Sequence, residues 1–231
     1  MRGPRVKILG IGNVLWADEG FGVRTVEALN RSHAFGPNVQ LIDGGTQGIY
    51  LVQHVQAADI LVVFDAIDYG LAPGTLKLIE GDAVPNFMGA KKMSLHQTGF
   101  QEVLAMAQLL GDYPQHLLLV GVQPAELEDY GGSLRPVVQA CVEPAIAAAL
   151  TWLDALGIRP ERRSGPLPGD QSLHPAQLDQ AAYESQRPSA ADACRLGDAR
   201  VLHDRDTVFD PKPNDLGARP LRVNVDSRRK D

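Results

Sequence analysis

Three carboxylates and one imidazole in this chain have the types and spacing to do chemistry together: Glu19, Asp43, Asp65 and His96. Two carboxylates and an imidazole can bind a borderline divalent metal such as nickel or zinc. An incomplete ligand set leaves coordination positions open for a substrate. A further carboxylate can orient a water molecule or act as a general base. The pattern therefore raises the possibility of metal-assisted chemistry, provided that the fold brings these residues together.

Strand and helix signals alternate through the first part of the chain. Continuous apolar runs predict strands buried on both faces, and an alternating run predicts one more; these are Val6–Ile11, Val39–Ile42, Ile60–Phe64, Leu117–Val122 and, alternating, Thr75–Ile79. Helical spacing or capping signals predict the helices, at Val23–Leu29, Ile49–Val55, from a capping box at Thr98–Gln101, and Val138–Leu156, where Pro144 marks a kink or the true start. We therefore predict an α/β fold: a three-layer, doubly wound, mostly parallel twisted sheet between helices.

The four candidate residues belong to segments that such a fold brings to one edge. In doubly wound sheets, ligands bind outside the carboxyl ends of the strands. Glu19 follows the first strand, Asp43 and Asp65 end the second and third, and His96 precedes the Thr98 helix. We expect the four side chains to converge at that edge.

Each of these residues also has a simpler interpretation. Asp18 or Glu19 can cap a helix, and an aspartate at a strand end, like Asp43 or Asp65, is common in turns. His96 can be structural. A dinucleotide site is disfavoured, because the first loop lacks the third glycine and its acidic residues would repel a pyrophosphate.

Composition divides the chain near residue 160. Residues 1–159 hold 10 Lys+Arg and 16 Asp+Glu, which accounts for the whole net charge of −6, and the remainder holds 12 of each. Half of the 16 prolines fall after residue 159. We predict a domain over 1–159 and a disordered, proline-rich extension over 160–231.

The acidic balance argues against nucleic acid as a partner. Cys141 and Cys194 form no CxxC pair, and we expect no membrane-length apolar run, no membrane insertion and a cytoplasmic location.

Five segments, in order, resemble the signatures of the hydrogenase maturation protease family. They are Gly10–Arg24, Asp43–Gly48, Phe64–Asp68 with Pro73–Thr75, Ser94–Gly99, and Leu119–Pro124. The text around Asp68–Gly70 and Gly89–Ser94 is most similar to the branch that serves membrane-bound uptake hydrogenases.

This resemblance implies an endopeptidase that removes a C-terminal peptide from a nickel-loaded [NiFe]-hydrogenase large-subunit precursor. The family's metal-contacting residues fall on Glu19, Asp65 and His96, and the nickel is supplied by the substrate. The aspartate implicated in cleavage falls on Asp43, so the catalytic set is Asp43, Glu19 and Asp65. Two alternatives stay open here: a nickel-site checkpoint chaperone that does not cleave, and a Rossmann-like nucleotide-binding module.

Overall fold

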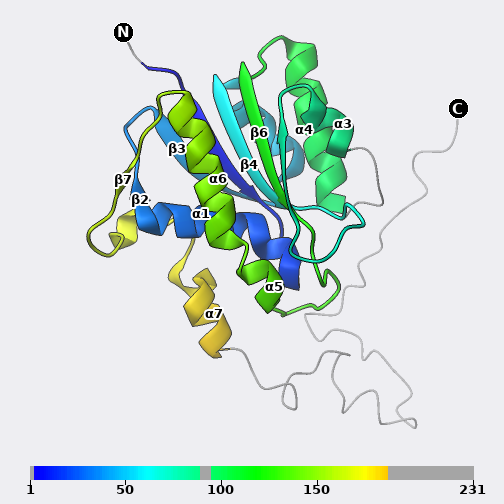
Figure 1. The fold of residues 1–231 in the computed structure, drawn as a ribbon, viewed down its shortest axis with the longest axis vertical. Coiled ribbons are helices and arrows are strands. Elements are labelled where there is room, and N and C mark those ends of the chain that lie inside the picture. The colour runs from blue at the N-terminus through cyan, green and yellow to red at the C-terminus, as the bar shows by residue number, and fades with distance from the viewer. Residues whose placement is uncertain (1–2, 89–94, 187–231) are drawn as a thin grey trace, which may run out of the picture. The chain divides into compact units, whose positions relative to one another are not determined.

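A mostly parallel five-stranded sheet forms the centre of the protein, in a computed structural model that describes residues 3–88 and 95–186 (Figure 1). The strands are β1 (Val6–Ile11), β3 (Val39–Gly45), β4 (Ile60–Ala66), β5 (Leu76–Glu80) and β6 (His116–Val122). They lie in the order β3-β1-β4-β6-β5, and only β5 among them is antiparallel to its neighbour. Each of the five strands was predicted from its apolar run, and the fold class is confirmed.

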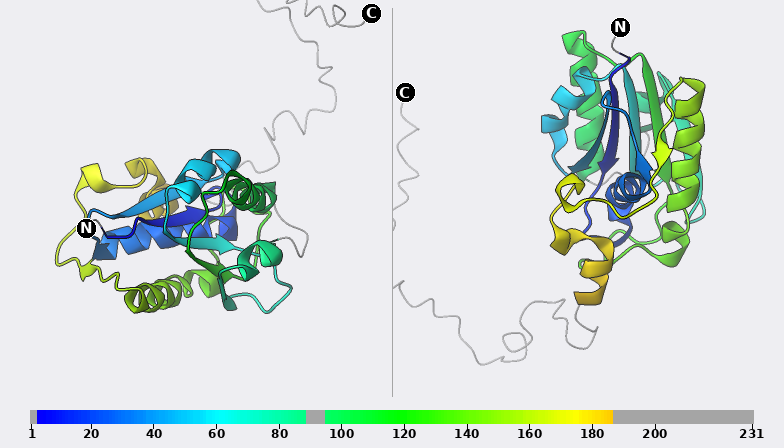
Figure 2. Two further views of the ribbon diagram at one scale, coloured as in Figure 1. Left: turned by 90° about the horizontal axis from the view of Figure 1, so that it is seen from above. Right: turned by 90° about the vertical axis from the view of Figure 1, so that its left-hand side faces the viewer.

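Alternate residues of the central strands enter two separate cores, one on each face of the sheet. Ile8, Val62 and Leu118 point into the core covered by α1 (Phe21–Ser32), the short α5 (Pro136–Gln139) and α6 (Val142–Ala155). Their neighbours along the strands point into the core covered by α2 (Val52–Gln56), α3 (Ala83–Met88) and α4 (Leu95–Leu110). Figure 2 shows the sheet between these two helical layers. Burial on both faces explains why the strands are continuously apolar.

Helix α4 begins earlier than its predicted capping box. The apolar stripe at Phe100, Val103 and Leu104 is buried as expected, but the helix starts at Leu95. Thr98 therefore lies inside the helix, and the prediction that it opens the helix was wrong. A Thr-x-x-Gln spacing also fits the interior of a helix, so that this pattern does not by itself locate the first turn.

The stretch Pro136–Ala155 corrects the prediction that no apolar run has membrane length. It is 20 residues long with a mean hydropathy of 1.4, which passes the test of length and composition. In the fold this stretch carries α5 and α6, whose side chains Val138, Ile146 and Leu153 are buried in the core of the domain. Its apolar character is that of a core helix, and Pro144 lies in the first turn of α6, as predicted.

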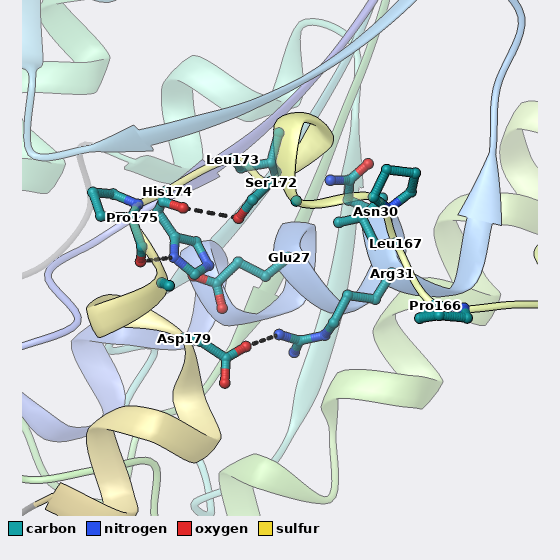
Figure 3. A pocket seen from close by; sticks show the side chains of 13 residues that line it. Glu27, Asn30, Arg31, Pro166, Leu167, Ser172, Leu173, His174, Pro175 and Asp179 are labelled. Atoms are coloured by element: carbon teal, nitrogen blue, oxygen red, sulfur yellow. Dashed lines mark hydrogen bonds and ion pairs between the residues drawn. The ribbon is translucent and has the colours of Figure 1, made fainter.

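The chain stays packed on the domain well beyond residue 159. Strand β7 (Glu161–Arg162) pairs with β2 (His33–Ala34), and η3 (Gly169–Gln171), η4 (Ala176–Leu178) and α7 (Gln180–Gln186) follow. The compact unit includes all of these elements. The predicted boundary at residue 159 is therefore too early. Its contacts with α1 include hydrogen bonds from Arg24 and Asn30 and an ion pair with Arg31 (Figure 3), which leave no apolar period along the chain. The disorder predicted after residue 186 falls outside the described residues.

Candidate active site

The parallel strands bring Asp43 and Asp65 to the same edge of the sheet. Asp43 of β3 lies opposite Gly10 of β1, and Gly10 lies opposite Phe64 of β4. Asp65 is the next residue of β4 and lies opposite Gly121 of β6. The backbones of Asp43 and Asp65 thus both lie at the carboxyl ends of their strands, with Asp43 level with Phe64, one residue before Asp65. The convergence of the candidate side chains stays a prediction.

Helix α1 begins directly on these strand ends. A Cβ atom placed on Gly22 would lie 2.1 Å from the Phe64 carbonyl oxygen and 2.3 Å from that of Ile11. Only glycine permits so close an approach of helix and sheet. The turn η1 (Ala17–Gly20) leads into α1 and carries Glu19. The close packing of Gly22 therefore holds Glu19 near the end of β4.

Asp18 and Glu19 are neighbours in sequence but have different environments. Asp18 is fully buried, and its Oδ2 accepts hydrogen bonds from the backbone N–H groups of Ala125 (2.8 Å) and Glu126 (2.9 Å). Its Oδ1 accepts one from the N–H of Arg135 at 2.7 Å. Asp18 thus ties η1 to the loop after β6, a structural role. Glu19 is only partly buried, and burial raises the pKa of its carboxyl group.

Asp65 is a buried carboxylate in an unfavourable electrostatic environment. The residue is 3% exposed, and its Oδ2 has no hydrogen-bond partner among the described residues. Burial raises its pKa well above the usual range, the Ala66 N–H opposes this, and the charge of Glu19 adds to the increase. A carboxylate next to a like charge in a low dielectric is stabilised by a cation or a proton. Glu19 and Asp65 are therefore candidates for binding a cation.

Tyr69 is a residue of this edge that sequence reasoning missed. A Cβ on Gly121 would lie 2.1 Å from the Tyr69 hydroxyl oxygen, so the ring occupies space that only glycine leaves free. Burial, with a smaller effect of the Asp65 charge, raises the Tyr69 pKa. The Lys77 ammonium lies 5.6 Å from the centre of the ring. Tyr69 therefore forms one wall beside Asp65; the sequence signal available was a tyrosine directly after Asp68.

Gln123, in the fifth signature, holds the turn that follows β4. The side chain is buried, and its Oε1 accepts hydrogen bonds from the N–H groups of Tyr69 (2.7 Å) and Leu71 (3.1 Å). Its Nε2 donates to Asp68 Oδ1 at 3.0 Å. One amide thus fixes the turn after β4 and, with it, the position of Tyr69.

Asp43 lies in a different electrostatic environment from Asp65. Burial raises its pKa, whereas a hydrogen bond from Gly45 and the charges of His174 and Arg24 lower it. Gly45 has φ +45°, a left-handed conformation that favours glycine and turns the chain sharply after Asp43. Burial and these charges thus act on the Asp43 pKa in opposite directions, and burial has the largest effect.

His96 lies in the first turn of α4, because the helix begins at Leu95. The expectation that it precedes the helix was therefore wrong. The placement of its side chain falls outside what the structure describes. In the part of the chain that is described, no group of three His, Cys, Asp or Glu residues is close enough to hold a metal. Asp65 and Glu19 are two of the three residues predicted as metal ligands, and the charge of Glu19 adds to the effect of burial on the Asp65 pKa.

The protein is a doubly wound α/β domain with carboxylates at the carboxyl ends of its strands. This is the edge at which α/β enzymes bind their ligands. The model of the family "Hydrogenase maturation protease" matches residues 23–152. The chain is 62% identical over 199 residues to the hydrogenase expression/formation protein HupD of Thiocapsa roseopersicina, covering 86% of this chain and 90% of that protein. It is 39% identical to the hydrogenase 2 maturation protease of Escherichia coli, covering 67% of this chain and 93% of that protein.

The solved structure of the hydrogenase maturating endopeptidase HybD from E. coli matches with a TM-score of 0.66 and 38% identity, over 69% of this chain and 98% of that one. The chain belongs to the hydrogenase maturation protease family and is a protease. The higher identity to HupD than to the E. coli hydrogenase 2 protease agrees with the predicted uptake-hydrogenase branch. Because the chain belongs to a family of proteases, neither the non-cleaving chaperone nor the nucleotide-binding module describes it.

Proposed function

We propose that this protease removes a C-terminal peptide from the precursor of a [NiFe]-hydrogenase large subunit once nickel has been inserted. Glu19, Asp65 and His96 complete the coordination of the nickel that the substrate carries. The metal belongs to the substrate, so three protein ligands suffice, and the remaining positions are filled by the precursor. Nickel then marks the precursor as ready and can polarise the carbonyl group of the bond to be cut.

Oδ2 of Asp65, which has no hydrogen-bond partner among the residues that the structure describes, is the observation that carries this proposal. A buried carboxylate oxygen without a hydrogen bond costs free energy in the unliganded protein. The neighbouring Glu19 increases that cost, because its charge raises the Asp65 pKa further. A divalent cation bound by both groups removes both penalties at once. The two carboxyl groups thus destabilise the free enzyme, and binding of the nickel-bearing precursor removes this destabilisation.

Asp43 is our candidate for orienting the attacking water or accepting its proton. It stands at the carboxyl end of β3, as Asp65 stands at that of β4. The hydrogen bond from Gly45 and the charges of His174 and Arg24 oppose the effect of burial on the Asp43 pKa and so favour the ionised form, which is the form that a base requires. Glu19 and Asp65 have a catalytic part as well, through the metal that they hold.

The partner that follows from this function is the large-subunit precursor, folded around its metal centre. The acidic balance of the chain disfavours nucleic acid. The packing of α5 and α6 into the core disfavours membrane insertion. We place the reaction in the cytoplasm, where the precursor is made.

Purified protein incubated with nickel-loaded and nickel-free precursor tests the function. We expect mass spectrometry to show loss of a C-terminal peptide from the loaded precursor only. Asp65→Asn should leave that precursor uncut. Asp59→Asn is the matched control, because Asp59 directly precedes β4, at the opposite end of that strand, and pairs with Arg5. Cleavage by Asp65→Asn at the rate of Asp59→Asn would refute the metal-binding role.

A further inference from the structure

Asp65, Gly121 and Lys77 form one row across three neighbouring strands. Asp65 of β4 lies opposite Gly121 of β6, and Gly121 lies opposite Lys77 of β5. Neighbouring strands are about 4.8 Å apart, so the backbones of Asp65 and Lys77 are separated by roughly 10 Å. A carboxylate and an ammonium group therefore belong to the same row, with only a glycine between them.

Both charged side chains project from the same face of the sheet. Residues that lie opposite one another share a face, and along a strand every second side chain returns to it. The residues two positions away on each strand belong to the core covered by α2, α3 and α4: Val63, Leu119 and Ile79. Asp65 and Lys77 therefore project toward that side, and Gly121 leaves a gap between them.

The ring of Tyr69 fills the gap over Gly121. A Cβ atom on Gly121 would lie 2.1 Å from the Tyr69 hydroxyl oxygen and 3.0 Å from Cζ of the ring. Tyr69 packs against the same core. The Lys77 ammonium lies over the ring, 5.6 Å from its centre, in a cation–π contact. Lys77 thus reaches the ring from β5, whereas Asp65 lies on the other side of Gly121, on β4.

The turn after β4 fixes the position of the ring. The Tyr69 N–H donates to Oε1 of the buried Gln123 at 2.7 Å. Asp68 Oδ1 accepts hydrogen bonds from the Gly70 N–H at 2.8 Å and from Gln123 Nε2 at 3.0 Å. Gly70 has φ +67°, a left-handed conformation that favours glycine. These contacts hold the backbone of Tyr69 so that its side chain lies back over the sheet.

An ion pair between Lys77 and Asp65 would compete with a bound cation. A lysine has a flexible four-carbon stem, and the row is narrow enough for it to span once the gap is open. A buried carboxylate that is paired with an ammonium group must give up this partner before it can bind a metal, and breaking a buried pair is costly. A bulky side chain in the gap prevents the pair from forming.

We propose that Tyr69 is a positioning residue that keeps Lys77 away from Asp65. Its ring fills the gap over Gly121 and holds the Lys77 ammonium group on the side of β5. The Asp65 carboxylate then stays available for a cation. That this cation is the nickel of the substrate rests on the proposed function, whereas the separation of the two charges does not.

A double-mutant cycle in urea tests the separation without nickel and without precursor. Unfolding free energies of the full-length protein are measured for Asp65→Asn, Lys77→Met and both together, with Tyr69 present and with Tyr69→Ala. With Tyr69 present, we expect the two substitutions to be additive. With Tyr69→Ala, Asp65→Asn should lower the urea midpoint unless Lys77→Met is also present. A coupling that Tyr69→Ala does not change would overturn the proposal.

Two further substitutions of Tyr69 keep the cycle decisive. Tyr69→Leu is the second background, in case Tyr69→Ala does not fold, because leucine keeps an apolar side chain against the core and is too short to cover Gly121. Tyr69→Phe keeps the ring, and its coupling should stay close to that measured with tyrosine. A coupling in Tyr69→Phe as large as that in Tyr69→Ala would assign the effect to the hydroxyl group and would also overturn the proposal.

Cleavage of nickel-loaded precursor connects the separation to function. Tyr69→Ala should cleave several-fold more slowly than wild type, and adding Lys77→Met should restore most of the rate. Lys7→Met is the matched control, because Lys7 lies opposite Leu61, four residues before Asp65 on β4. It should restore nothing. A rate that Lys77→Met does not restore, or that Lys7→Met restores equally well, would reduce Tyr69 to a packing residue.

The outcome for Asp65 itself separates this proposal from the proposed function. Cleavage by Asp65→Asn at the wild-type rate would refute the role of Asp65 in binding nickel. The cycle in urea would still decide whether Tyr69 keeps Lys77 away from Asp65.

Discussion

Glu19 and Asp65 form a pair of like charges at the carboxyl end of β4, where the charge of Glu19 adds to burial in raising the Asp65 pKa. They come from elements of different kinds, the η1 turn and a central strand, which meet because Gly22 lets α1 approach the sheet closely. The arrangement is unfavourable for the free protein and suits a bound cation.

Asp65→Asn should therefore stabilise the free protein while abolishing cleavage. A carboxyl group whose folded pKa is raised contributes most stability below its unfolded pKa of about 4, and that stability is lost as pH rises through the folded pKa. At neutral pH the amide avoids this loss, and we expect a gain of roughly 0.5–2 kcal/mol in the free energy of unfolding, measured with urea. A variant less stable than wild type at pH 7 would show that Asp65 is satisfied in the free protein.

Removal of the charge should lower the stability of the protein at Asp18 but should affect cleavage at Glu19. Asp18→Asn replaces an acceptor oxygen by an amide group in a site where three backbone N–H groups converge, so we expect a loss of about 1–3 kcal/mol. Glu19→Gln should change stability little and should stop cleavage. Chemical denaturation of the two variants side by side gives the comparison. Equal stabilities would mean that the loop after β6 does not depend on Asp18.

The ion pair between Arg5 and Asp59 should contribute a pH-dependent part of the stability. Hydrogen bonds from Arg5 lower the Asp59 pKa to about 2. A carboxyl group with a lowered folded pKa contributes stability above its unfolded pKa of about 4, and this is lost as pH falls through about 2. The difference in unfolding free energy between wild type and Asp59→Asn should thus be present at pH 7 and shrink below pH 4. A difference that does not change with pH would contradict this assignment.

A chain that ends at residue 160 should be less stable than one that ends at residue 186. The shorter chain loses the hydrogen bonds from Asn30 to Gln171, from Arg24 to Leu178 and from Arg163 to Ser32. At about 0.5–1.5 kcal/mol for each bond, we expect a loss of roughly 2–4 kcal/mol. Thermal melts of the two chains measure it. Equal melting temperatures would show that residues 161–186 add nothing to the stability of the domain.

The sheet was predictable because its signal is local. Runs such as Ile60–Phe64 are apolar at every position, since both faces of each central strand are buried. The common edge of Asp43 and Asp65 then followed from the rule for parallel strands, before any geometry was known. The start of α4 was missed because Thr98 fits both a cap and a helix interior.

The packing of residues 161–186 on the domain and the position of Tyr69 beside Asp65 could not be predicted in the same way. His174 and Glu27 are far apart in the sequence, and a polar contact between them leaves no periodic pattern. Tyr69 reaches the site only because Gly121, on another strand, lacks a side chain. The distinction between Asp18 and Glu19 likewise depends on backbone N–H groups more than a hundred residues away. These features arise from tertiary packing, which spacing along the chain does not encode.

The most direct test of the central claim is cleavage of nickel-loaded precursor by His96→Ala, followed by mass spectrometry of the precursor's C-terminus. His96 lies in the first turn of α4, and replacing it there should cost on the order of 1 kcal/mol in stability. The variant should therefore fold. It lacks the only nitrogen among the proposed ligands, whose preference for nickel over hard cations no carboxylate replaces. We predict a folded protein that leaves the precursor at full mass. Removal of the C-terminal peptide at the wild-type rate would contradict the account of nickel recognition.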